Sequence, residues 1–158
     1  MKRLYVFRHA KTEEAGLFGS DFKRNLKERG QEDARKISRH LLENKHIPGI
    51  ILCSTANRTM QTCEIFVKES GYKGELKHLE NLYHASASGI LDIIAEHAED
   101  YDRIMVIGHN MGISQLANTL CKSGCEELPT SGVAIIDFRD IIEPYLGELK
   151  ALITPKNI

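Results

Sequence analysis

Histidine and arginine residues stand directly after three short apolar runs of the sequence. Arg8 and His9 follow the first run, Arg58 follows the second within the segment STANRT, and His109 follows the third. Each run has the pattern of a buried strand, and open α/β sheets hold their ligands outside the carboxyl ends of parallel strands. Parallel strands would therefore bring two histidines and two arginines to one pocket.

Phosphoryl transfer is the chemistry that this combination favours. A neutral imidazole attacks phosphorus when an acceptor holds its other ring nitrogen and fixes the tautomer. The reaction otherwise needs positioning and charge stabilisation on the equatorial oxygens, which two guanidinium groups and a second histidine supply without a metal. The sequence has no carboxylate cluster typical of metal sites, no phosphate-binding Walker loop, no dinucleotide loop and no nucleophile elbow.

Arg58 by itself supports two interpretations. Ser54 or Thr55 is a natural N-cap, which would place Arg58 in the first turn of a helix. A cation there opposes the helix dipole at a cost of a few tenths of a kcal/mol or more, and a bound anion removes that cost. The plainer interpretation is an arginine that points to solvent.

The histidines have plainer interpretations as well. Adjacent residues of an extended strand point to opposite faces, so Arg8 and His9 reach one ligand only if the strand ends there and the backbone turns. Otherwise His9 is a core residue beside a surface arginine. His109 is equally compatible with a simple strand-to-helix turn in which Asn110 caps the helix.

The apolar periodicity predicts an α/β fold with helices on both faces of a mixed, mostly parallel sheet, which is a three-layer α/β/α arrangement. We interpret residues 1–158 as one domain, and we expect the last two strands to be antiparallel and close to one edge. Strands are expected at 3–7, 50–53, 76–79, 103–108, 132–138 and 148–153, and helices at 28–45, 56–70, 87–98 and 111–122. Residues 10–26 show no periodicity, and a loop of that length is usually functional or disordered.

The bulk properties exclude several classes of protein. The 158 residues carry a net charge of -1, which does not favour nucleic acid or a membrane surface as a partner. No apolar run is long enough to span a bilayer and the N-terminus does not have the pattern of a signal peptide, so we expect a cytoplasmic protein. The four cysteines are expected to be reduced and structural, with Cys121 and Cys125 lacking a second ligand pair for zinc.

Three segments in this order, VFRHAKT, CSTANRTMQT and VIGHNMG, resemble the signature segments of the histidine phosphatase superfamily. The short chain and the stretch DFKRNLKERGQEDA resemble more narrowly the SixA-type phosphohistidine phosphatases, in which an Asp, an Arg-x-Leu and a Gly punctuate this segment. The matching residues are Asp21, Arg24, Leu26 and Gly30, and the resemblance covers residues 3 to about 140. It implies a phosphoglycerate-mutase-like fold.

The resemblance also implies roles for the converging side chains. His9 would accept the phosphate, Arg8 and Arg58 would clamp it, and His109 would stabilise the transferring group, with no cofactor and no metal. Lys11 and His84 are further candidates for contacting substrate.

The general acid is the point of departure from the family. Many members have a glutamate where the segment ENLYHAS of this chain has His84, and Glu80 lies four residues earlier. Either residue is a candidate acid, and a third alternative is that no residue has this role.

The substrate prediction follows from that departure. A phosphoester needs an acid to protonate its alkoxide leaving group, whereas phosphohistidine leaves as imidazole, a much better leaving group. The chain also lacks the long insertions that cover the sites of larger relatives, which suits a side chain presented by a phosphorelay or phosphocarrier protein. We therefore predict a phosphohistidine phosphatase with a phospho-His9 intermediate. The alternatives are a small-molecule phosphomonoesterase and a catalytically weak module that binds phosphate or phosphoprotein.

Overall fold

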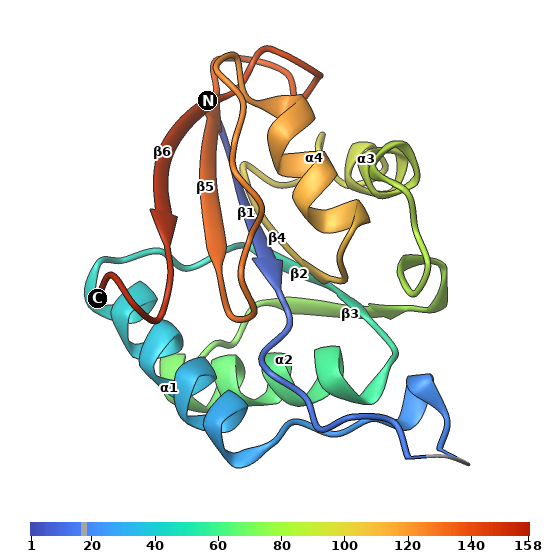
Figure 1. Cartoon of the computed structure of the whole chain (residues 1–158). Helices are drawn as coiled ribbons and strands as arrows, with labels where there is room; N and C mark the ends of the chain where they lie inside the picture. The colour runs from blue at the N-terminus through green and yellow to red at the C-terminus, as the bar shows by residue number, and fades with distance from the viewer. Residues whose placement is uncertain (17–18) are drawn as a thin grey trace.

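The computed structural model describes residues 1–16 and 19–158, within which six strands form one sheet and four α-helices cover it (Figure 1). The strands are β1 (Lys2–Arg8), β2 (Ile50–Ser54), β3 (Glu75–Leu79), β4 (Arg103–Gly108), β5 (Val133–Phe138) and β6 (Glu148–Ile153). The helices are α1 (Glu28–Glu43), α2 (Asn57–Ser70), α3 (Ala87–Ala95) and α4 (Gly112–Leu120), with single 3₁₀ turns η1 (Asp21–Lys23) and η2 (Glu80–Leu82).

The strand order is β3-β2-β4-β1-β5-β6, so β4 lies between β2 and β1 in the middle of the sheet. Strand β4 pairs in parallel with both β1 and β2, and β3 pairs in parallel with β2. Strands β5 and β6 run antiparallel, β5 to β1 and β6 to β5. The predicted mixed sheet with an antiparallel edge is therefore confirmed, and the carboxyl ends of β1, β2 and β4 meet at one edge.

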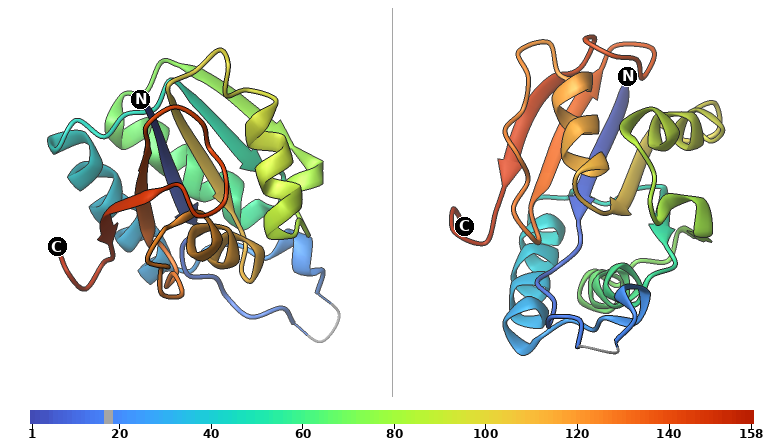
Figure 2. Two further views of the ribbon diagram at one scale, coloured as in Figure 1. Left: turned by 90° about the horizontal axis from the view of Figure 1, so that it is seen from above. Right: turned by 45° about the vertical axis from the view of Figure 1, so that its right-hand side comes forward.

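The core has two halves, one on each face of the sheet. Along β1, Leu4 and Val6 point to the face covered by α3 and α4, whereas Tyr5 and Phe7 point to the face covered by α1 and α2. All four side chains are fully buried, as expected for a strand that is covered on both faces. Both views in Figure 2 keep the two helix pairs on opposite sides, which confirms the three predicted layers.

The helix boundaries differ slightly from those expected. The helix predicted over 87–98 ends at Ala95, and the one predicted over 111–122 spans Gly112–Leu120. On α1, Leu41 is buried but Leu42 is 42% exposed, because the next residue of a helix is rotated by about 100° away from the core-facing stripe. Among the described residues, no helix combines the length and the apolar character needed to cross a bilayer.

The long loop after β1 is anchored at several points. Thr12 forms an isolated bridge with Leu26, and η1 lies beside α2 (Figure 2). The first turn of α1 touches the loop so closely that a Cβ on Gly30 would lie 2.0 Å from the carbonyl oxygen of Lys11. Only glycine allows that approach. Within the predicted loop, residues 17–18 lie outside the described part of the chain.

Candidate active site

A cavity of about 750 Å³ opens where the carboxyl ends of β1, β2 and β4 meet. Every side chain proposed from the sequence as a site residue lines it. These residues are Arg8, His9, Lys11, Arg58, His84 and His109. The structure thus brings together residues that are up to 101 positions apart in the sequence, since the parallel strands end at the same edge.

His9 lies just beyond the end of β1, where the backbone turns. Its amide donates a hydrogen bond to the carbonyl of Gly108 (3.2 Å), and its carbonyl accepts one from the amide of Ser131 (3.1 Å). Because β1 ends at Arg8, both Arg8 and His9 reach the cavity, as the sequence required for a shared ligand.

The ring of His9 is held in one tautomer. Its Nδ1 lies 2.7 Å from the carbonyl oxygen of Ala10, and a carbonyl can only accept, so the proton is on Nδ1 and Nε2 carries the free lone pair. Burial lowers the pKa of His9 to about 4, and the positive charges of Arg58 and Arg8 contribute to the lowering. The imidazole is therefore neutral at pH 7, which is the state that a nucleophile requires.

His109 follows β4 and lies against His9, with a distance of 5.4 Å between the ring centroids. Its Nε2 forms a 2.8 Å hydrogen bond with Oγ of Ser54, at the end of β2. Burial lowers the pKa of His109 to about 3, helped by the nearby charge of Arg58. Like His9, the ring is therefore neutral at pH 7.

Two buried nitrogen atoms of the cavity-lining residues are unpaired within the described part of the chain, Nδ1 of His109 and Nε of Arg8. The rest of the Arg8 guanidinium is anchored, because Nη1 donates to the carbonyl of Leu128 (2.9 Å). Buried polar atoms are nearly always hydrogen-bonded in folded proteins. Both nitrogens belong to residues that line the cavity, and neither has its hydrogen-bonding capacity used within the described residues.

Arg58 is held in the cavity by Asp21 of the η1 turn. Its Nη1 donates to the backbone carbonyl of Asp21 (2.8 Å) and its Nη2 lies 3.1 Å from the carboxylate. The same carboxylate accepts hydrogen bonds from Tyr83 and Arg24. These donors, the Tyr83 hydroxyl first, hold the pKa of Asp21 well below its usual range. Asp21 therefore remains ionised and links the loop after β1 to α2.

Tyr83 is a site residue that our sequence analysis missed. Its ring packs 3.9 Å from the ring of His84 and 5.5 Å from that of His109, measured between centroids, and the Arg58 guanidinium lies 5.7 Å from its centroid. Burial and the hydrogen bond to Asp21 raise the pKa of its hydroxyl. The only sequence feature that could have pointed to Tyr83 is its position next to the candidate His84. The role of its hydroxyl depends on a contact with Asp21, which lies 62 positions away.

The predicted N-cap of α2 is wrong. The capping position is Ala56, and no side chain caps the helix. Ser54 is the last residue of β2, so its hydroxyl points to the ring of His109 instead. A different residue connects α2 to the segment after β1: the Oγ1 of Thr62 accepts from the amide of Ala10 (3.0 Å) and donates to the carbonyl of Arg58 (2.7 Å).

The remaining candidates lie at different places. Lys11 and His84 are exposed residues of the cavity lining, whereas Glu80 is an exposed residue of η2 and does not line the cavity. Asn110 does not cap α4, because the helix begins two residues later and the Asn110 amide contacts Ser114 and Glu127 instead.

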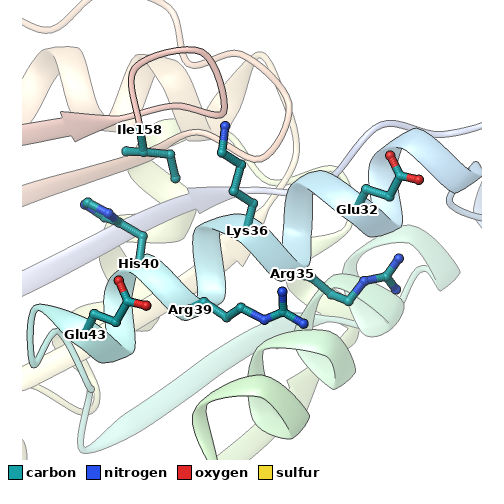
Figure 3. Close-up of a pocket in the computed structure, with 7 residues that line it drawn as sticks. All are labelled: Glu32, Arg35, Lys36, Arg39, His40, Glu43 and Ile158. Atoms are coloured by element: carbon teal, nitrogen blue, oxygen red, sulfur yellow. The ribbon is translucent and has the colours of Figure 1, made fainter.

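A second hollow of about 440 Å³ lies on the outer face of α1, far from the strand ends (Figure 3). It is lined by Glu32, Arg35, Lys36, Arg39, His40, Glu43 and Ile158. Apart from the C-terminal residue, all of these belong to one helix. Figure 3 shows that Arg35 and Arg39 both extend along the outside of the helix, so the hollow has the character of a solvated helix face.

Comparison with known proteins agrees with this geometry. A family model for the histidine phosphatase superfamily (branch 1) matches residues 4–87. An uncharacterized protein of Mycobacterium tuberculosis is 30% identical over 127 residues, which is 74% of this chain and 78% of that protein. The crystal structure of a protein assigned as the phosphohistidine phosphatase SixA of Agrobacterium tumefaciens superposes with a TM-score of 0.85 at 27% identity, covering 98% of both chains.

The fold is also shared with phosphatases of small molecules. A mycobacterial glucosyl-3-phosphoglycerate phosphatase, in complex with VO3, superposes with a TM-score of 0.70 at 15% identity, covering 96% of this chain and 98% of that one. At that identity the likeness concerns the fold alone. The substrate of this chain must therefore be argued from its own side chains.

Proposed function

We propose that this chain, which belongs to the histidine phosphatase superfamily, is a phosphohistidine phosphatase that removes phosphate from a histidine of a partner protein. The observation that carries the proposal is the state of His9. Its Nδ1 proton is hydrogen-bonded to the carbonyl of Ala10, and its neutral ring lines a cavity that is also lined by three arginines, Arg8, Arg24 and Arg58. Such an imidazole is an activated nucleophile toward phosphorus.

The proposed reaction has two steps. The Nε2 lone pair of His9 attacks the phosphorus of the bound phosphohistidine, a new P–N bond forms, and the P–N bond of the substrate breaks. The departing ring takes the bonding electron pair and leaves as neutral imidazole, because its other nitrogen is already protonated. A water molecule then attacks phospho-His9, and the P–N bond to His9 breaks to release inorganic phosphate and restore Nε2.

In the proposed mechanism, the arginines and the second histidine stabilise the negative charge on the transferring phosphoryl group. Arg8 and Arg58 bind the equatorial oxygens with their guanidinium groups, and the ring of His109, which lines the same cavity, helps to hold the transferring group. Because these side chains suffice for positioning and charge, the proposed mechanism uses no metal and no cofactor. Asp21 acts as a positioning residue, since its backbone carbonyl and its carboxylate both accept hydrogen bonds from the Arg58 guanidinium.

The partner side of the proposal concerns the rim of the cavity. Lys11 and His84 are exposed there, where they would contact a protein that presents its phosphohistidine. Imidazole is a good leaving group, so the reaction is compatible with a site in which Glu80 does not line the cavity. We propose a cytoplasmic phosphorelay or phosphocarrier domain as the substrate, acted on by residues 1–158 as one domain.

A small-molecule phosphomonoesterase is the second candidate. The observation that favours it is the placement of His84, which lines the cavity and packs on Tyr83. As an imidazolium, with both ring nitrogens protonated, its ring would be the acid that an alkoxide leaving group requires.

One experiment separates the two candidates. The purified protein is incubated with a phosphohistidine-bearing phosphocarrier protein and, in parallel, with a panel of sugar and aryl phosphates. The proposal predicts a kcat/KM at least about 100-fold higher for the phosphoprotein, a difference of roughly 3 kcal/mol in transition-state stabilisation. It also predicts that His84→Ala leaves this turnover within about threefold. Faster turnover of the esters, lost in His84→Ala, would establish the second candidate instead.

A further inference from the structure

Two cysteines and a histidine converge on the β3 edge of the sheet, and the proposed reaction uses none of them. Cys53 lies in β2, Cys63 in α2 and His78 in β3, and their sulfur and ring nitrogen atoms all lie within 4.8 Å of one another. In the described ranges 1–16 and 19–158, no other three His, Cys, Asp or Glu side chains come together in this way.

The backbone fixes this convergence. In the parallel register of β2 and β3, Cys53 is the partner of His78, so both side chains point to the same face of the sheet. Helix α2 covers that face, and Cys63 belongs to its buried stripe with Phe66. Three neighbouring elements therefore each contribute one ligand atom to the same point, without any change in the fold.

We propose that Cys53, Cys63 and His78 form a binding site for a thiophilic divalent cation, with zinc as the best match. Zinc prefers a tetrahedral set of thiolate and imidazole ligands, and a water molecule completes the coordination when the protein supplies three. Bonds of about 2.3 Å from zinc to each sulfur place the two sulfurs about 3.8 Å apart. In the structure no two of the three ligand atoms are more than 4.8 Å apart, which is within about 1 Å of that separation.

The surroundings of the cluster offer an ion a path of entry and a nearby negative charge. The Cys53 and Cys63 side chains are buried, whereas His78 is exposed and gives the ion a path of entry. Burial and the neighbouring Cys63 sulfur raise the pKa of the Cys53 thiol, and the nearby Glu64 carboxylate adds to this effect. A bound cation reverses each of these influences, because it stabilises the thiolates and is attracted by the carboxylate.

Other cysteines and histidines of the chain provide control variants for this proposal. Cys121 and Cys125 lie close enough to each other to interact, but they belong to no group of three ligands in the described residues. His9 and His109 are the alternative imidazoles, since they lie side by side in the active-site cavity. Variants at these positions therefore distinguish the proposed site from adventitious binding elsewhere.

The test uses the full chain, reduced and freed of metal. Cobalt(II) is added while the thiolate-to-cobalt charge-transfer absorption is recorded, and zinc is then titrated by calorimetry. We expect one ion per chain, an absorption typical of two thiolate ligands, and displacement of cobalt by zinc. His78→Ala should weaken zinc binding about 10-fold or more, and Cys63→Ser should reduce the charge-transfer band, whereas Cys125→Ser and His9→Ala should leave both unchanged.

Three results would overturn the proposal: no stoichiometric zinc binding at tens of micromolar ion, binding that His78→Ala does not weaken, or binding that His9→Ala removes. Cys63 is buried, so its serine variant has a risk of misfolding. The exposed His78 avoids that difficulty, and its alanine variant decides the question alone.

Discussion

Two hollows on this molecule are lined by arginine, lysine and histidine, and they differ in how those side chains are assembled. The active-site cavity takes its residues from several elements: the end of β1, the segments that follow β1, β3 and β4, the starts of α2 and α4, and the segment before β5. The hollow on α1 takes nearly all of its residues from the surface of one helix (Figure 3).

The difference is clearest for one arginine from each place. The Arg58 side chain is 8% exposed and is held by Asp21, whereas the Arg39 side chain is 61% exposed and pairs with Glu69 across the surface. Exposed ion pairs contribute about 0–1 kcal/mol because water screens them. A buried guanidinium beside neutral histidines instead gives an incoming anion a preorganised partner. Convergence at strand ends, rather than the kind of residue, distinguishes the candidate active site.

The largest expected effect is at His9, the proposed nucleophile. His9→Ala should reduce phosphatase turnover by at least about 1,000-fold, because no covalent intermediate can form. His40→Ala, which removes an imidazole from the α1 hollow, is the matched control and should leave turnover unchanged. The rate of phosphate release from a phosphohistidine protein measures both. If both variants lost turnover to a similar extent, the active-site cavity would not differ in catalytic importance from the α1 hollow.

Next comes the pair of arginines. Arg58→Ala should lower kcat/KM by about 30- to 1,000-fold, which corresponds to the roughly 2–4 kcal/mol lost with one preorganised donor. Arg39→Ala removes a guanidinium that is exposed in the other hollow and should change kcat/KM by less than about twofold. If Arg58→Ala behaves like Arg39→Ala, the charge at Arg58 has no part in the reaction.

The two buried histidines of the active-site cavity should make the free energy of unfolding depend on pH. The pKa values of His9 and His109 are lowered to about 4 and about 3, below the value of about 6.5 for an unfolded chain. Between these values the unfolded chain binds more protons, so the free energy of unfolding should fall as pH decreases from 6.5 toward 4. The expected loss is on the order of 1–3 kcal/mol per histidine.

Urea denaturation between pH 7.5 and 4.5 measures this dependence. A His9→Gln variant should show a shallower decrease than the unchanged chain, since one of the two buried imidazoles is absent. An identical decrease in both proteins would show that His9 is not held neutral by burial.

A smaller effect is expected for the residue that holds Arg58. Asp21→Asn keeps the size of the side chain but removes the charge that binds Arg58, Arg24 and Tyr83. We expect kcat to fall about 10-fold through the loss of orientation, with a smaller change in KM. Restoration of kcat in Asp21→Glu would identify a positioning role. A kcat unchanged in Asp21→Asn would contradict it.

The sequence predicted the elements because their apolar periodicity is strong. Strands β4 and β6 have the expected boundaries, and the convergence of Arg8, His9 and His109 follows from placing each after a parallel strand. The resemblance to the histidine phosphatase superfamily, which had been based on three short motifs, is confirmed by the family match.

The contacts between loops could not be predicted in the same way. Asp21 meets Tyr83 only because η1 and η2 lie on the same side of the cavity, and no local pattern encodes that proximity. Ser54 was assigned to the wrong role for a related reason. Whether the Ser54 hydroxyl caps α2 or contacts His109 depends on where β4 ends beside β2. The cluster of Cys53 and Cys63 with His78 likewise depends on the β2–β3 register.

The central claim, that His9 carries the phosphate, is tested most directly by trapping the intermediate. A phosphocarrier protein labelled with ³²P on its histidine is mixed with the purified chain, the reaction is quenched in alkali within milliseconds to seconds, and the labelled peptide is identified by mass spectrometry. If His9 carries the phosphate, acid-labile and alkali-stable label will be found on His9, will turn over to free phosphate, and will be absent in His9→Ala. Phosphate release that proceeds equally well in His9→Ala, or label on another residue, would contradict it.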